Sequence, residues 1–132
     1  MGAREIDIGR RAMEAIAAHD IEGFLEFVHP EVTFQSLILE AEATTYHGHA
    51  GVRRWWDDVR EVFPDWHVSW GDMTSHGDRF LVRIRVRGQG AASGVAVEQP
   101  MWQAVQVRDG KIVWWTLYRD EAEARAAVGP ED

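Results

Sequence analysis

The sequence predicts an α+β domain in which helices pack on the concave face of a bent, antiparallel or mixed sheet. In the first half of the chain, apolar residues recur with the helical period of about 3.6. From Trp66 onward they alternate with polar residues, with the period of two that is typical of strands. Helices followed by a run of long strands favour an α+β arrangement.

Length and composition are those of one globular domain spanning residues 1–132. Apolar residues make up 45% of the chain and charged residues 27%, and no apolar run is long enough to span a bilayer. We therefore expect a soluble protein without a membrane partner. Residues 1–11 carry charges throughout and lack the apolar segment of a secretory signal, which favours the cytoplasm.

The formal net charge of −8 disfavours nucleic acid as a partner, because an acidic protein repels phosphate backbones. The seven tryptophans are a large aromatic load for 132 residues. Such rings fill a core, line a ligand cavity or form an oligomer interface, and composition does not choose among these uses.

Two helices are expected at the start of the chain. In residues 4–19, the apolar side chains lie on one side of an amphipathic helix. Asp20 can then cap a second helix that continues to Val28, and His29-Pro30 ends it.

A third predicted helix has the clearest pattern in the chain. It begins near Gly51, and Pro64 ends it. Between the second and third helices, Val32–Phe34 resembles a short strand, whereas residues 35–50 show no period and are expected to form a loop. The apolar face of the third helix consists of Val52, Trp55, Trp56, Val59 and Phe63.

The second half of the chain is expected to form an antiparallel sheet. The expected strands begin at residue 66 and continue over residues 79–88, 95–107 and 112–119. Residues 75–78 and 88–94 are typical of connections, and Asp109-Gly110 is a strong hairpin signal. Asp120 then begins a short C-terminal helix.

Three segments carry a family resemblance: His29-Pro30-Glu31-Val32, residues 46–53, and Arg108-Asp109-Gly110-Lys111-Ile112 with Tyr118-Arg119-Asp120. In their order and spacing they resemble the SnoaL-like polyketide-cyclase group of the nuclear-transport-factor-2-like superfamily. The resemblance implies a cone-shaped roll with one deep pocket, used for cyclisation, isomerisation, dehydration and epoxide hydrolysis, and also for binding without chemistry. It also implies that no cofactor is needed, because an acid or base inside an apolar cavity carries the chemistry.

Asp120 is the first candidate catalytic residue. The resemblance implies that it is the aspartate that follows the last strand in SnoaL-like cyclases and acts as a base on an acidic carbon. The alternative is structural, because Asp120 stands in the N-cap position with Glu123 at capping-box spacing. One residue can serve both uses.

Strand periodicity divides residues 113–118 between two faces of the sheet. Trp114 and Tyr118 share the face of Asp120, so they are expected to accompany it if it points inward. The Tyr118 hydroxyl could then donate a hydrogen bond to a developing oxyanion. The alternative is a half-buried tyrosine that is bonded to backbone or water.

His47 and His49 form a His-x-His pair before the third helix. This spacing suits metal chelation from an extended segment, but no third ligand stands at recognisable motif spacing, so we expect no metal. His47 is instead a candidate general base, and His49 is expected to have a structural role at the start of the helix.

Gln35 and Gln103 lie on predicted strands, where an amide can orient a carbonyl or hydroxyl of a ligand. Related sequences often carry histidine at these places, which weakens the hypothesis of an enzyme. The tryptophans have core spacing as well as the size to wall a pocket. The residues expected to contact the substrate are Phe34, Gln35, Trp55, Trp66, Gln103 and Trp114.

The leading hypothesis is a cofactor-independent acid/base enzyme of the cyclase, isomerase, dehydratase or hydrolase type. Asp120 would be its base, His47 or Tyr118 would assist, and its substrate would be an apolar or polycyclic molecule. The alternative is a non-catalytic binding or sensing protein with the same cavity. A third possibility is a structural dimer module. We expect a homodimer through the outer sheet face, which excludes neither pocket hypothesis, and its expected contacts are Val113, Trp115, Leu117 and Trp102.

Overall fold

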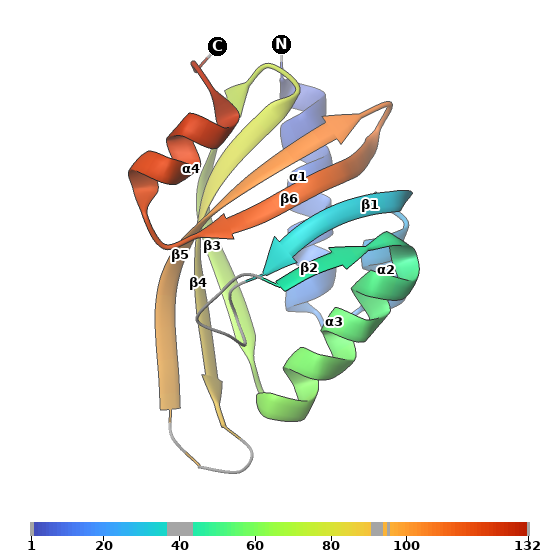
Figure 1. Cartoon of the computed structure of the whole chain (residues 1–132), viewed down its shortest axis with the longest axis vertical. Coiled ribbons are helices and arrows are strands. Elements are labelled where there is room, and N and C mark those ends of the chain that lie inside the picture. The colour runs from blue at the N-terminus through green and yellow to red at the C-terminus, as the bar shows by residue number, and fades with distance from the viewer. Residues whose placement is uncertain (1, 37–43, 91–93, 95, 132) are drawn as a thin grey trace.

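The computed structural model describes residues 2–36, 44–90, 94 and 96–131. These residues form helices and strands in the order that the sequence predicts, with one additional strand before the third helix (Figure 1). The elements are α1 Ala3–Ala17, α2 Ile21–Leu25, β1 Val28–Ser36, β2 Thr44–His47, α3 Gly48–Val62, β3 His67–His76, β4 Arg79–Gln89, β5 Ala96–Arg108, β6 Lys111–Tyr118 and α4 Glu121–Val128.

All six strands belong to one mixed sheet with the order β2-β1-β6-β5-β4-β3. β1 pairs in parallel with β6, and every other neighbouring pair is antiparallel. The predicted hairpin between β5 and β6 is confirmed. Asp109 and Gly110 both have positive φ, at 53° and 78°, as a two-residue hairpin turn of this hand requires.

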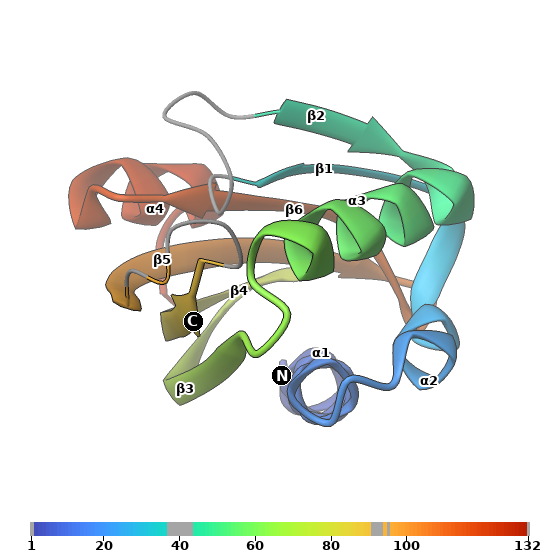
Figure 2. The ribbon, with the colours of Figure 1, turned by 90° about the horizontal axis from the view of Figure 1, so that it is seen from below.

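The sheet curves around α1 and α3, which pack on its concave face, as the end-on view of Figure 2 shows. α1 follows the predicted amphipathic pattern, with Ile8, Ala12 and Ile16 buried one turn apart. α4 lies on the opposite, outer face, against β4, β5 and β6. No helix in the described part of the chain is long and apolar enough to cross a membrane.

The second helix is shorter than predicted, because a strand replaces its last turn. α2 ends at Leu25, and β1 already begins at Val28. The backbone N–H of Ile112 donates to the carbonyl of Phe27 at 2.8 Å, and a His49 ring nitrogen lies 2.8 Å from the carbonyl of Val28. These long-range hydrogen bonds give the backbone partners that a further helical turn would otherwise supply.

Part of the expected loop at residues 35–50 is structured. Thr44–His47 forms β2, which pairs with β1, and α3 begins at Gly48 instead of Gly51. A strand of four residues is too short to show a period in the sequence, so its pairing with β1 is what reveals it. Residues 37–43 of this stretch, and residues 91–93 of the expected connection before β5, lie outside the described residues.

The two faces of β6 are reversed relative to the prediction. Trp115 and Leu117 are buried on the concave face, where the Trp115 ring stacks on Phe34 with centroids 4.0 Å apart. Trp114 and Tyr118 lie on the outer face, beside α4. Periodicity separates the two sets correctly but does not say which set faces the helices.

Candidate functional site

A cavity of about 40 Å³ lies between the helices and the concave face of the sheet. α1, α2, α3 and four strands contribute to its wall, so it occupies the centre of the fold. Among the residues that the structure describes, none of those lining the cavity is titratable. The lining residues are Met13, Ile16, Phe24, Trp55, Trp66, Val68, Ile84, Val86, Gln103, Trp115 and Leu117.

Aromatic rings make up a large part of the wall. Trp55 meets the rings of Trp66 and Trp115 in edge-to-face arrangements, with centroids 6.2 and 6.4 Å apart. The Trp55 indole N–H donates to the Ser36 hydroxyl at 3.1 Å, so its polar atom has a partner. Phe34 lies behind Trp115 and supports it without lining the cavity.

Two polar atoms of the wall are buried without a partner. Trp66 Nε1 and Gln103 Oε1 find no hydrogen-bond partner among the described residues. An unpaired buried polar group costs about 1–3 kcal/mol, so such groups are rare and call for an explanation. Both belong to residues that line the same cavity, so a molecule inside it could satisfy them.

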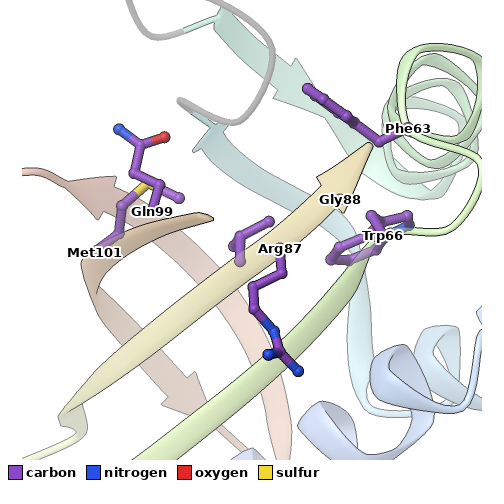
Figure 3. A pocket seen from close by; sticks show the side chains of 7 residues that line it. Phe63, Trp66, Arg87, Gly88, Gln99 and Met101 are labelled. Atoms are coloured by element: carbon purple, nitrogen blue, oxygen red, sulfur yellow. The ribbon is translucent and has the colours of Figure 1, made fainter. Parts of the chain in front are cut away.

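A second, smaller pocket of about 20 Å³ lies at the end of β4, near the C-terminus of α3. Figure 3 shows Phe63 and Trp66 near this end of the strand, and Gln99 and Met101 farther away on the neighbouring strand β5. Trp66 and Val86 line both this pocket and the central cavity, so the two spaces are neighbours. A third void of about 20 Å³ shares Gln103 with the central cavity, on the side of α1.

A wider surface depression of about 210 Å³ lies over β3 and β4, beside the bulge between Trp70 and Met73. Its two arginines are already engaged. Arg83 lies over the Trp102 ring, with its guanidinium carbon 5.5 Å from the ring centroid, and Arg85 forms a 2.7 Å ion pair with Glu98. Neither side chain is available as a free cation for an anionic ligand.

Asp120 lies outside the cavity. It is exposed and occupies the N-cap of α4, where its Oδ1 accepts a hydrogen bond from the backbone N–H of Ala122 at 3.2 Å. The predicted inward placement is corrected, because the face that Asp120 shares with Trp114 and Tyr118 is the outer one. The cap alternative describes the observed contact.

The other two candidate catalytic residues also lie on the outer face. β2 pairs with β1 so that His47 stands opposite Thr33, and His47 Nδ1 lies 3.2 Å from the Thr33 hydroxyl. Tyr118 packs against the small cluster of apolar residues beneath α4. Neither side chain lines the cavity, so Asp120, His47 and Tyr118 do not form a constellation there.

Of the six predicted substrate contacts, Trp55, Trp66 and Gln103 line the cavity. Gln35 and Trp114 do not. Gln35 points to the outer face and donates through Nε2 to the Thr45 hydroxyl at 3.2 Å. Trp114 lies under the guanidinium of Arg79, whose central carbon is 4.7 Å from the ring centroid.

His47 and His49 have different contacts in the structure. His47 is exposed on the outer face, whereas a ring nitrogen of His49 lies 2.8 Å from the carbonyl of Val28 and joins the start of α3 to β1. This contact agrees with the structural role expected of His49. Within the described ranges, no group of three or more histidine, cysteine, aspartate and glutamate side chains could hold a metal ion.

Several lining residues were not singled out by sequence reasoning. Met13, Ile16 and Phe24 belong to predicted apolar helix faces, and Val68, Ile84 and Val86 belong to predicted strand faces. Their periodicity marks them as core. Periodicity does not show which core residues line a cavity, because this depends on how side chains from distant elements pack together.

A family model described as the SnoaL-like domain matches residues 9–115 of the chain. No curated protein is similar enough in sequence to count as a match. Three solved structures are similar over almost their whole length. One is an NTF2-like protein of unknown function from Burkholderia pseudomallei, with a TM-score of 0.78, 18% identity and coverage of 97% of this chain and 99% of that one.

The second is TerC, which was co-crystallised with polyporic acid; its TM-score is 0.77, its identity is 21%, and the match covers 92% of this chain and 95% of TerC. The third is a candidate SnoaL-like polyketide cyclase from Jannaschia sp. CCS1, with a TM-score of 0.74, 17% identity and coverage of 96% and 94%. These likenesses show an NTF2-like α+β fold.

Proposed function

This chain belongs to the SnoaL-like domain family, and we propose that it is a non-catalytic protein that binds one small, largely apolar molecule in its central cavity. The observation that carries the proposal is the composition of the wall. Apolar and aromatic side chains surround the cavity, and among the described residues the polar atoms of its lining side chains that are buried without a partner are Gln103 Oε1 and Trp66 Nε1. Such a lining is typical of sites that bind small molecules.

The same observation argues against acid/base catalysis at this site. General acid/base catalysis needs a titratable group within hydrogen-bond reach of the reacting atoms, at about 2.6–3.2 Å. Asp120, His47 and Tyr118 are on the other side of the sheet, and the described lining residues do not titrate. Of the two functions that the sequence leaves open, the binding protein therefore fits the geometry better.

The size of the cavity limits its ligand. Pockets for drug-sized ligands typically measure about 300–1,000 Å³. The central cavity measures about 40 Å³, and the two neighbouring voids add about 20 Å³ each. A polycyclic molecule is too large for this space, so the expected ligand is no larger than one ring. The crystallisation of TerC with polyporic acid supports the view that the fold can hold small organic molecules.

The experiment that tests this function measures the affinity for toluene by isothermal titration calorimetry at several values between pH 5 and pH 8. A cavity without titratable groups should give a dissociation constant that does not change with pH. The variants Asp120→Asn and His47→Gln should leave it unchanged as well. A dissociation constant that follows the titration of a carboxyl or an imidazole would instead favour an acid/base site.

We also infer a homodimer through the outer sheet face, although not with the contacts that the sequence suggested. Trp115 and Leu117 are buried inside, whereas Trp102 is half-buried on the outer face and is only partly covered by α4. Sedimentation at micromolar concentration should show a dimer, and Trp102→Glu should give a folded monomer because it places a charge in the interface. A monomeric wild-type protein would contradict this assembly.

A further inference from the structure

We propose that the central cavity selects a neutral ligand that carries one hydroxyl group on a hydrocarbon body, and that Gln103 and Trp66 recognise this hydroxyl. The inference rests on the proposed binding function and specifies the chemistry of its ligand. It is carried by two buried polar atoms without a partner among the described residues, Gln103 Oε1 and Trp66 Nε1, which belong to side chains that line one small cavity.

The two side chains come from different segments of the chain. Trp66 lies just before β3, is only 2% exposed and contacts the rings of Trp55, Trp56 and His19. Gln103 lies in the middle of β5, between Val82 on β4 and Leu117 on β6. Because Trp66 is packed among three rings and the Gln103 backbone is paired on both sides, both side chains are constrained before a ligand binds, which reduces the entropy lost on binding.

A hydroxyl matches these two atoms better than other neutral groups do. An indole N–H can only donate a hydrogen bond, and an amide oxygen can only accept one. A hydroxyl placed between them would accept from the Trp66 N–H and donate to Gln103 Oε1, and would so satisfy both atoms. A ketone or an ether only accepts, and it would leave the Gln103 oxygen unpaired.

Charged ligands fit the cavity less well. Burying an ionised group is costly unless an opposite charge accompanies it, and no described residue of the wall carries a charge. The rings of Phe24, Trp55 and Trp115 could attract a methylated ammonium ion through their faces. However, the Trp66 N–H presents the positive end of its dipole and would have to stay unpaired beside that cation.

Water is the competing occupant. One water needs about 10–15 Å³ of such space, so the cavity of about 40 Å³ holds about three. Among the described residues, two polar atoms of the lining side chains are buried without a partner, while most of the wall is apolar. A ligand hydroxyl reproduces the hydrogen bonds of one water, and the hydrocarbon body replaces the poorly bound remainder, which favours the ligand.

The test compares phenol with toluene, which has the same ring and a methyl group in place of the hydroxyl. Tetramethylammonium serves as the cationic probe. Calorimetric titration of the full chain at pH 7 should show phenol binding about tenfold more tightly than toluene, since two buried hydrogen bonds are made only with phenol. Tetramethylammonium should not bind measurably.

Variants of Gln103 and Trp66 test whether these two residues cause the preference for phenol over toluene. Gln103→Met keeps the length of the side chain and removes its amide, so the ratio of toluene to phenol dissociation constants should fall about threefold, the share of one of the two hydrogen bonds. Gln35→Met is the matched control, because it makes the same change on the outer face and should leave the ratio unchanged. Trp66→Phe removes the N–H from the other side and should lower the ratio as well, provided that circular dichroism shows a folded protein.

Failure of the inference is distinct from failure of the proposed function. If phenol and toluene bind equally and Gln103→Met does not change their ratio, the hydroxyl preference is wrong while the binding function stands. Tighter binding of tetramethylammonium than of phenol would also overturn the preference. If neither aromatic probe binds at millimolar concentration, the binding function itself is wrong for ligands of this size.

Discussion

At the scale of single residues, Asp120 illustrates how a local backbone requirement can account for a carboxylate that looks catalytic. Its Oδ1 accepts from the N–H of Ala122, one of the amide groups that the first turn of α4 leaves without an internal partner. Asp20 does the same for α2, where its Oδ1 accepts from the N–H of Gly23 at 2.9 Å. Both aspartates follow the N-cap pattern that their sequence positions indicate.

We predict that Asp120→Ala lowers the free energy of unfolding by about 1 kcal/mol, the usual loss when an N-cap is removed. Asp120→Asn is the matched control and should be close to neutral, because asparagine caps as well as aspartate does. Urea denaturation measures both variants. If asparagine destabilised the protein as much as alanine, the negative charge and not the cap would be the important property.

Gln103 is the residue at which stability and binding conflict. Its Oε1 is buried without a partner among the described residues, and a buried acceptor that no protein group pairs is unfavourable. We therefore predict that Gln103→Met raises the free energy of unfolding by about 1 kcal/mol while it weakens recognition of a hydroxyl. Chemical denaturation with Gln35→Met as the control tests this, and a destabilised Gln103→Met would contradict it.

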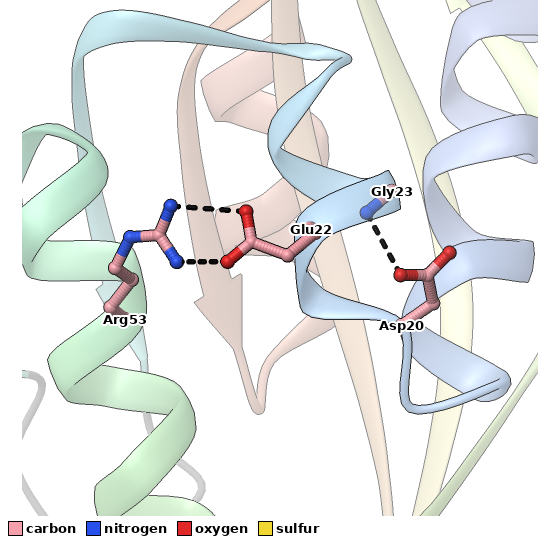
Figure 4. A network of polar contacts seen from close by, with 4 residues as sticks. All are labelled: Asp20, Glu22, Gly23 and Arg53. Carbon is pink, nitrogen blue, oxygen red and sulfur yellow. Dashed lines mark hydrogen bonds and ion pairs between the residues drawn. The ribbon is translucent and has the colours of Figure 1, made fainter.

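At the scale of elements, an ion pair joins α2 to α3 across the surface of the molecule. Both terminal nitrogens of Arg53 bond the carboxylate of Glu22, and the contact from Nη2 to Oε2 measures 3.1 Å (Figure 4). This hydrogen bonding to Arg53 lowers the pKa of Glu22 below its ordinary value, against the opposing effect of desolvation. Both side chains are exposed, so the contribution is small and is screened by salt.

The pH dependence of this pair has a definite sign. Because the pKa of Glu22 is lower in the folded protein, its stabilising contribution is present above the unfolded pKa and is lost as the pH falls through the folded pKa. We predict that the melting temperature of the wild type falls more between about pH 6 and pH 3 than that of Glu22→Gln does. Arg53→Gln should show the same reduced slope, and the double variant should add nothing further.

At the scale of the whole molecule, a side chain that filled the central cavity would stabilise the fold but exclude the ligand. The cavity is enclosed by side chains from α1, α2, α3 and the strands β3 to β6, with Trp66 from the connection before β3. A core without this cavity would gain packing energy. The central cavity is therefore the feature of the molecule that most favours a ligand-binding role.

We predict that Val68→Leu, which adds one methylene at the cavity wall, raises the free energy of unfolding by about 0.5–1 kcal/mol and weakens the binding of toluene. Val62→Leu is the matched control, because Val62 is 43% exposed on α3 and the same change there should alter neither property. Thermal denaturation and calorimetric titration measure the two effects. An unchanged toluene affinity in Val68→Leu would place the ligand elsewhere.

Much of the fold could be predicted from local patterns. The apolar face of α3, the alternation in β4 and the Asp109-Gly110 turn all depend on interactions within a few residues, so the sequence indicates them directly. β2 and the early end of α2 could not be predicted in this way. Their backbone partners come from distant segments, namely Thr33 to Ser36 for β2 and Ile112 for the segment after α2.

The candidate site likewise combines features that local sequence patterns predict with features that depend on tertiary packing. Local periodicity and backbone hydrogen bonding predict the approximate positions of the helices, the hairpins, the caps at Asp20 and Asp120 and the division of β6 into two sets of side chains. Which of the two sets faces the helices depends on tertiary packing. This packing placed Trp115 and Gln103 around the cavity and left Asp120, His47 and Tyr118 outside, because the inner face of a sheet is chosen by the helices that pack on it.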